Sequence, residues 1–139
     1  MDILKLVREL DFPQSEYIVI GGAAMAIRDL KKTQDIDILI SKKLLEGLRK
    51  LDTWQNHPRI IASEEAGLIN KDKTIELYPS IASDTITFES LKSNEEIIEG
   101  VPFANLEDIV KIKTYYAREK DLKDIELIKV YLNKDHENE

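Results

Sequence analysis

Two aspartates, Asp35 and Asp37, stand one residue apart in the segment Asp-Ile-Asp-Ile-Leu-Ile. In a β-strand, residues i and i+2 point to the same face, so the two carboxylates would share one small space while Ile36 and Ile38 point the other way. Like charges that close repel each other, and the ionised pair is favourable mainly when a cation lies between them. Because hard oxygen ligands suit Mg²⁺ or Mn²⁺, we predict a catalytic metal site at Asp35 and Asp37.

A third carboxylate, Glu76, lies on a later predicted strand, where Ile75 and Leu77 would face the core. Two metal ions about 4 Å apart, held by three carboxylates, can activate an attacking hydroxyl and stabilise the oxygen that leaves a phosphorus centre. We therefore predict that Glu76 is a catalytic residue and a metal ligand in phosphoryl or nucleotidyl transfer. The alternative is an exposed glutamate on an edge strand, which protects the sheet against aggregation.

The pair Gly21-Gly22 stands between an apolar run, Tyr17-Ile18-Val19-Ile20, and a predicted helix. At such a turn, backbone N–H groups and the helix N-terminus can hold a phosphate without obstruction by side chains. Asp-x-Asp alone occurs by chance on solvated strand faces, but the order strand, double glycine, helix and Asp-x-Asp favours a metal and nucleotide site.

Lys113 lies on the apolar side of a predicted C-terminal helix. From there it could reach a triphosphate and offset the charge that the metals leave uncompensated. The alternative is a lysine whose stem covers apolar surface while its ammonium group reaches water. Trp54 and His57 fall in a loop-like stretch, and we interpret them as packing or rim residues without a chemical role.

The elements that must position these residues follow from hydrophobic periodicity and from Gly, Pro and capping residues. Helices are predicted over residues 2–10, 23–30, 42–52, 105–117 and 121–132, with Ser41 and Asp121 as N-caps, and strands over residues 17–20, 35–40, 59–62, 67–69, 74–78 and 96–103, the last interrupted near Gly100 and Pro102. The pattern predicts an α+β fold: a small mixed β-sheet flanked by helices, with a C-terminal helical hairpin. We expect one domain over residues 1–139, with the sheet core in 1–104 and the hairpin in 105–134.

The composition of the 139 residues, with no cysteine and only His57 and His136, excludes disulfides, thiolate zinc sites and a histidine cluster. The net charge of −7 argues against a broad DNA-binding surface, although a local basic patch remains compatible with it. No apolar run approaches the roughly 20 residues of a membrane helix, and the N-terminus lacks a signal-peptide core, so we expect a cytoplasmic protein.

Two motifs, Ile20-Gly21-Gly22-Ala23-Ala24 and Thr33-Gln34-Asp35-Ile36-Asp37-Ile38, resemble the hallmark of the DNA polymerase β-like nucleotidyltransferase superfamily. The pattern is similar to the minimal nucleotidyltransferases and to the AbiEii-like group of toxin–antitoxin systems. The C-terminal segments 106–113 and 118–125 are similar to that group's downstream Lys and Asp motif. The resemblance implies the nucleotidyltransferase fold.

The same resemblance implies that Asp35 and Asp37 ligate Mg²⁺ or Mn²⁺, that Gly21 and Gly22 contact nucleotide phosphates, and that Lys113 touches the bound NTP. It implies transfer of a nucleoside monophosphate from an NTP, often ATP, to a hydroxyl on a protein or RNA, with release of pyrophosphate. The alternative is an antitoxin or binding module of the same fold, with little or no catalysis, that pairs with a HEPN-type partner protein.

The chain departs from the family pattern at three positions. Ala23 replaces a hydroxyl residue after the glycines, Lys31 stands where relatives often have Arg, and Glu76 stands where Asp is usual. Glu is longer than Asp by one methylene, and catalytic geometry is sensitive to displacements of about 1 Å. The family also includes members that bind a partner without catalysis.

Overall fold

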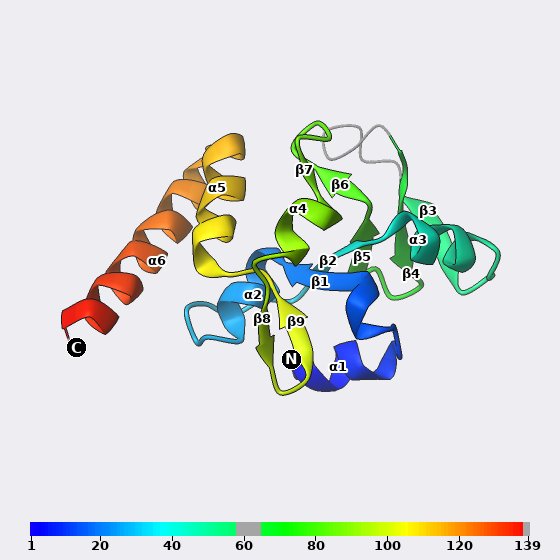
Figure 1. Ribbon diagram of the computed structural model, residues 1–139, viewed down its shortest axis with the longest axis horizontal. Coiled ribbons are helices and arrows are strands. Elements are labelled where there is room, and N and C mark those ends of the chain that lie inside the picture. Colours follow the sequence, from blue (N-terminus) through cyan, green and yellow to red (C-terminus); the bar gives the residue numbers. More distant parts are fainter. Residues whose placement is uncertain (58–64, 138–139) are drawn as a thin grey trace.

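The computed structural model describes residues 1–57 and 65–137. It consists of a mixed β-sheet with helices at both ends (Figure 1). Within these residues a seven-stranded sheet has the order β3-β4-β5-β2-β1-β9-β8, and β6 and β7 form a separate pair. The strands are β1 Tyr17–Ile20, β2 Ile36–Ile40, β3 Trp54–His57, β4 Gly67–Asn70, β5 Ile75–Tyr78, β6 Ser80–Ile81, β7 Ile86–Thr87, β8 Glu96–Ile98 and β9 Val101–Phe103. The helices are α1 Ile3–Glu9, α2 Gly21–Ala26, α3 Lys42–Arg49, α4 Phe88–Lys92, α5 Leu106–Tyr116 and α6 Glu119–Glu137, with a short 3-10 helix at Gln14–Glu16. The predicted α+β class is confirmed.

The centre of the sheet is apolar on both faces, because β1 and β2 carry almost only branched aliphatic side chains. β2 pairs antiparallel with β1 and parallel with β5. Fully buried core side chains on these three strands are Ile18, Val19, Ile36, Ile38, Leu39, Ile40 and Leu77. This rigid centre fixes the register that places Asp37 opposite Ile20 on one side and opposite Glu76 on the other.

The segment predicted as one strand over 96–103, interrupted near Gly100 and Pro102, is a hairpin of β8 and β9. The interruption near Gly100 is confirmed, but the single strand is wrong, and Pro102 lies within β9. Ile98 pairs with Val101, and Glu99 and Gly100 form the turn between them with φ of 47° and 83°. Two successive residues with positive φ match the twist of a tight hairpin, which a linear strand pattern does not reveal.

Residues 54–57, predicted as loop, form β3 at the edge of the sheet, where Trp54 packs against Phe12 with ring centroids 6.2 Å apart. The strand predicted over 59–62 lies outside the described residues. The sequence patterns also predicted no element for β6, β7 or α4. The strands β6 and β7 have only two residues each. The strand, turn and strand predicted over 67–78 are confirmed, with the turn closed by Asn70.

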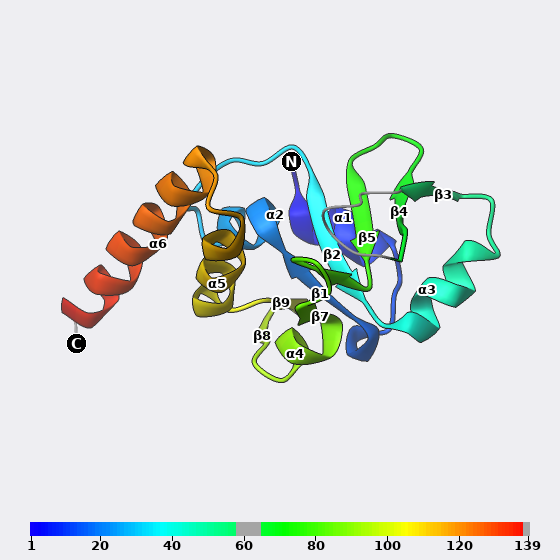
Figure 2. The ribbon, with the colours of Figure 1, turned by 90° about the horizontal axis from the view of Figure 1, so that it is seen from above.

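The predicted C-terminal hairpin is confirmed as α5 and α6, which lie side by side at one end of the molecule, while α3 lies at the other end (Figures 1 and 2). Asn105 caps α5 by accepting a hydrogen bond from the Asp108 N–H at 2.8 Å. Asp121 is not the N-cap of α6, because the helix begins at Glu119. Asp121 instead reaches back from the first turn and accepts from the Arg118 N–H at 3.1 Å.

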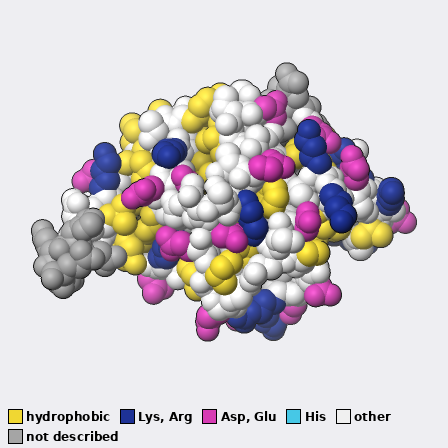
Figure 3. All heavy atoms as spheres, viewed as in Figure 1, with side chains coloured by type: hydrophobic (Ala, Val, Ile, Leu, Met, Phe, Trp, Pro, Cys, Tyr) yellow, Lys and Arg dark blue, Asp and Glu magenta, His cyan; other side chains and the backbone are white. Residues whose placement is uncertain are grey.

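None of the helices in the described ranges combines the length and the apolar character needed to cross a membrane. On the face seen in Figure 3, acidic and basic side chains are interspersed.

Candidate active site

A cleft of about 850 Å³ lies between the loop that enters β2 and the α5–α6 hairpin. Its volume falls within the range of about 300–1,000 Å³ that is usual for small-molecule sites. On the sheet side the cleft is lined by Ile20, Gly21, Gly22, Lys31, Lys32, Thr33, Gln34, Asp35, Asp37, Tyr78 and Ile81, and on the hairpin side by Ile109, Ile112, Lys113, Tyr116, Arg118, Lys120, Asp121 and Asp124. The cleft therefore brings together Asp35, Asp37, both glycines and Lys113, which the sequence places up to 92 positions apart.

Asp35 and Asp37 reach the cleft in different ways. Asp37 lies within β2 and is half-buried, whereas Asp35 precedes the strand, which begins at Ile36, and is exposed. The turn at Asp35 is held by Thr33, whose hydroxyl donates to the Asp35 carbonyl oxygen at 2.9 Å. Strand alternation therefore does not by itself place Asp35; the turn before β2 does. Within the described residues, neither a side chain nor a backbone group bonds the Asp35 carboxylate.

Gly21 and Gly22 form the first turn of α2, which begins two residues earlier and ends four residues earlier than predicted. Gly21 has φ of +64°, and a Cβ atom there would lie 3.0 Å from Asp37 Oδ2. A Cβ atom on Gly22 would lie 3.0 Å from Thr33 Oγ1. The missing side chains thus leave room for the Asp37 carboxylate and the Thr33 hydroxyl at the cleft wall.

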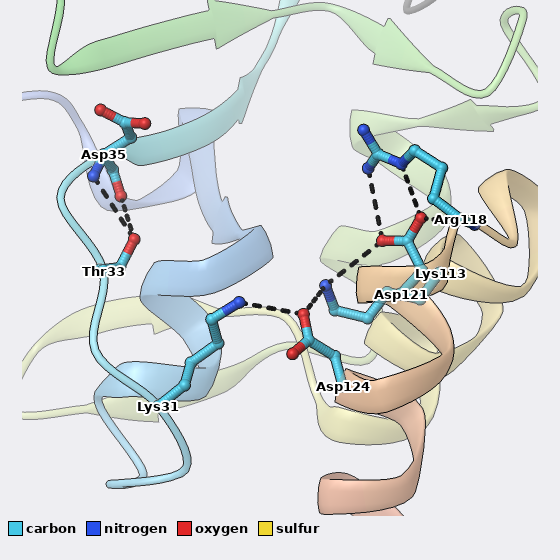
Figure 4. Close-up of polar contacts among 7 residues, drawn as sticks. All are labelled: Lys31, Thr33, Asp35, Lys113, Arg118, Asp121 and Asp124. Atoms are coloured by element: carbon cyan, nitrogen blue, oxygen red, sulfur yellow. Dashed lines mark hydrogen bonds and ion pairs between the residues drawn. The ribbon is translucent and has the colours of Figure 1, made fainter.

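A chain of alternating charges, with Lys113, Asp121 and Asp124 buried at its centre, crosses the hairpin side of the cleft (Figure 4). Lys113 Nζ donates to Asp124 Oδ2 at 2.8 Å and lies 3.8 Å from Asp121 Oδ1. Lys31, from the loop between α2 and β2, donates to the same Asp124 oxygen at 3.0 Å. Arg118 Nε completes the chain with a 2.7 Å bond to Asp121. Lys113 is 8% exposed, so its ammonium group is held inside the cleft wall and does not extend into water.

The pKa values of both aspartates reflect a competition between burial and these cations. Burial alone would raise the pKa of Asp124, but hydrogen bonds from Lys113 and Lys31 outweigh it and hold the pKa below its usual value. Burial alone would also raise the pKa of Asp121. Hydrogen bonds from Arg118, together with the charges of Arg118 and Lys113, outweigh this effect and lower the pKa. Both carboxylates are therefore ionised partners of the cleft cations at neutral pH.

Glu76 lies beside Asp37 in the parallel register of β2 and β5, but it is not part of the cleft lining. The Tyr78 hydroxyl donates to Glu76 Oε2 at 2.8 Å, and His57 Nε2 lies 3.2 Å from Glu76 Oε1. β5 runs between β4 and β2, so the interpretation of Glu76 as an exposed residue on an edge strand is wrong. The contact of His57 with Glu76 escaped the sequence analysis, because no local pattern joins residues on different strands.

Comparison with known proteins agrees with this geometry. A family model described as nucleotidyltransferase of unknown function (DUF6036) matches residues 1–138. The chain belongs to this family. Among solved structures, a candidate nucleotidyltransferase from Thermotoga maritima is similar at a TM-score of 0.55 and 17% identity, covering 96% of this chain and 94% of that chain. A comparison with curated proteins found no match.

Membership of a nucleotidyltransferase family assigns the general class of reaction, nucleotidyl transfer. The likeness to the Thermotoga protein shows the shared fold. The narrower resemblance to the AbiEii-like group stays a prediction, as do the metal, the nucleotide and the individual roles of Asp35, Asp37, Glu76, Gly21, Gly22 and Lys113.

The donor set of this nucleotidyltransferase cleft fits a hard divalent cation, since Asp35 and Asp37 offer carboxylate oxygens at one wall. Across residues 1–57 and 65–137, no three His, Asp or Glu side chains converge closely enough to hold a metal ion by themselves. Mg²⁺ is commonly bound by one or two carboxylates together with substrate phosphates and water. Two aspartates at the rim of a nucleotide-sized cleft match that mode.

Proposed function

We propose that this protein transfers a nucleoside monophosphate from an NTP, with ATP as the first candidate, to a hydroxyl group on a protein or RNA. The observation that supports this proposal best is the shared cleft, in which two carboxylates and two glycines face cations of the α5–α6 hairpin. The acidic pair suits a metal–nucleotide complex, and the cations suit its phosphates.

The nucleotide phosphates lie along Gly21 and Gly22, which line the cleft and have no side chains of their own. Lys113 and Lys31 face the triphosphate and exchange part of their contact with Asp124 for contact with phosphate oxygens. Asp35 and Asp37 would hold Mg²⁺ or Mn²⁺, which would supply Lewis-acid stabilisation of the charge that develops on the phosphate oxygens.

In the chemical step the acceptor hydroxyl oxygen attacks the α-phosphorus, and the bond from that phosphorus to the bridging oxygen of the β-phosphate breaks. The hydroxyl proton passes to Glu76, which lies outside the cleft lining on the strand beside Asp37 and is hydrogen-bonded to the cleft residue Tyr78. Pyrophosphate leaves with the bond electrons. Lys113 stabilises the charge of the departing pyrophosphate.

The test uses the four NTPs labelled at the α-phosphate, with Mg²⁺ and a cell lysate as the source of acceptors. Label should appear on a macromolecule with wild-type protein and disappear with Asp37→Asn. Asp52→Asn, an exposed aspartate after α3, is the matched control and should label normally. Label transfer that persists in Asp37→Asn at the wild-type rate would rule out this site.

A second candidate function is a binding module that pairs with a partner protein, such as the HEPN-type partner named above. Exposed apolar side chains on α6 favour it: Leu122, Leu127 and Val130 are 56%, 45% and 45% exposed. Calorimetry separates the two functions. Absence of nucleotide binding in the presence of Mg²⁺, together with a stable complex with the product of a neighbouring gene, would favour the module, while tight nucleotide binding supports the enzyme.

The toxin–antitoxin setting is part of the same proposal and rests on the resemblance of the motifs alone. Expression of the protein in a bacterial host, with and without the adjacent gene, tests it through growth. An enzyme toxin would slow growth when expressed alone, and Asp37→Asn would relieve that effect.

A further inference from the structure

The Glu76 carboxylate is held through both of its oxygens. Tyr78, two residues later on β5, donates its hydroxyl to Oε2 at 2.8 Å. His57, at the end of β3, brings Nε2 to 3.2 Å from Oε1. Tyr78 is 3% exposed and lines the cleft. Its hydrogen bond therefore connects Glu76 to a residue of the cleft wall.

The contact with His57 spans a whole strand. β4 lies between β3 and β5, so the two backbones are about 10 Å apart at the usual strand spacing. His57 pairs with Gly67 on β4, and a Cβ atom on Gly67 would collide with the Leu77 carbonyl oxygen and lie 2.6 Å from Tyr78 Cδ1. Because Gly67 has no side chain, the Tyr78 ring fits beside it. The centroid of the Tyr78 ring lies 6.2 Å from that of the His57 ring. Side chains from β3 and β5 meet because the strand between them has no side chain there.

His57 Nε2 is buried, and no described residue hydrogen-bonds it. Its approach to Glu76 is close in distance but does not have the geometry of a hydrogen bond. A buried polar atom without a partner is costly, and the carboxylate is the polar group that it faces. This favours a role for His57 that depends on Glu76.

We propose that Tyr78 and His57 are positioning residues, which fix the direction of the Glu76 carboxylate beside Asp37 for nucleotidyl transfer. A carboxylate has lone pairs enough to accept the Tyr78 hydrogen bond and still take a proton or bind a cation. Partners of this kind orient metal ligands and catalytic carboxylates, and their loss typically weakens metal binding or activity about 10- to 100-fold. The inference rests on the function proposed above.

The test compares Tyr78→Phe, His57→Ala, His57→Gln and Glu76→Gln with wild-type protein. The first readout is the affinity for Mn²⁺ in the presence of an ATP analogue with a methylene bridge between the α and β phosphates, measured by electron paramagnetic resonance without turnover. Tyr78→Phe and His57→Ala should weaken Mn²⁺ binding about 10- to 100-fold. His57→Gln, which keeps a polar nitrogen beside Glu76 Oε1, should restore part of the loss. Tyr115→Phe removes an exposed hydroxyl on α5 and is the matched control.

A double-mutant cycle separates positioning from a merely structural role. If Tyr78 acts through Glu76, the Tyr78→Phe change should lower kcat in wild-type protein at saturating metal and NTP, and cause no further loss in the Glu76→Gln background. Equal losses in both backgrounds would overturn the inference. Should Tyr78→Phe fail to fold, as judged by circular dichroism, the same cycle with His57→Ala decides the question.

The outcomes also distinguish this inference from the function on which it rests. Wild-type protein that binds no Mn²⁺–nucleotide complex would overturn both. Wild-type protein that binds the complex, with Tyr78→Phe and His57→Ala unchanged from Tyr115→Phe, would overturn the inference alone.

Discussion

A side chain on Gly21 would meet the Asp37 carboxylate, since a Cβ atom at Gly21 would lie 3.0 Å from Asp37 Oδ2. Gly21 begins α2 directly after β1, and the last residue of β1, Ile20, is in register with Asp37 on β2. The glycine and the acidic residue of the sequence motifs are thus parts of one contact.

Replacing Gly21 by Ala should destabilise the protein and abolish activity. The residue has φ of +64°, which costs a residue with a side chain about 1–3 kcal/mol, and the new methyl group would displace Asp37. Urea denaturation measures the first effect and label transfer the second. Gly47→Ala is the control, because its Cβ atom meets nothing within 4 Å on helix α3 and should stabilise by roughly 0.5–1 kcal/mol. Equal stability of Gly21→Ala and wild type would contradict the strain argument.

Replacing Thr33 by Val should reduce activity more than stability. The Thr33 hydroxyl donates to the Asp35 carbonyl oxygen and so holds the turn at Asp35. The same hydroxyl oxygen lies 3.0 Å from the position that a Cβ atom on Gly22 would occupy. Loss of one partly exposed hydrogen bond costs about 1 kcal/mol, whereas a displaced Asp35 should lower kcat/KM about tenfold or more. Thr53→Val, at an exposed turn residue, should change neither quantity. A normal kcat/KM for Thr33→Val would show that the turn does not position Asp35 for catalysis.

Replacing Asp124 by Asn should destabilise the packing of α6 on α5. The change leaves the buried Lys113 ammonium without its ionised partner at 2.8 Å, and broken buried pairs cost about 3 kcal/mol or more. Lys31→Ala removes a pair whose lysine is 32% exposed, so its cost should stay below about 1 kcal/mol. Chemical denaturation followed at the helical circular dichroism band measures both. A Lys31→Ala variant less stable than Asp124→Asn would reverse the proposed order.

The same aspartates make the hairpin sensitive to acid. Their pKa values lie lower in the folded protein than in the unfolded chain, so the folded state binds fewer protons. The stabilisation is present above the unfolded value of about 3.9 and is lost as the pH falls through the lower folded values. The free energy of unfolding of wild-type protein should therefore fall below about pH 4 more steeply than that of Asp121→Asn/Asp124→Asn. Parallel pH profiles would show that these carboxylates do not account for acid lability.

Much of the fold was readable from local sequence because its causes are local. Ser41 and Asn105 cap the helices that follow them, with their side chains accepting from backbone N–H groups three residues on. The apolar run of β1 and the polar turn after β4 likewise follow from residues that are neighbours in the chain. The short pair β6 and β7 and the edge strand β3 were missed, since two residues, or a polar run such as Trp-Gln-Asn-His, carry too little hydrophobic pattern.

The sequence by itself determined which side chains could do chemistry, because the Asp-x-Asp spacing, the paired glycines and the order of elements are properties of the chain. Only the tertiary structure decided which groups these side chains meet. Lys31 and Asp124 are 93 residues apart and share one hydrogen bond, and His57 reaches Glu76 over a strand on which Gly67 leaves room. Such contacts depend on the register of a sheet and the docking of a hairpin. Both arise from the packing of the whole core, and no short stretch of residues encodes them.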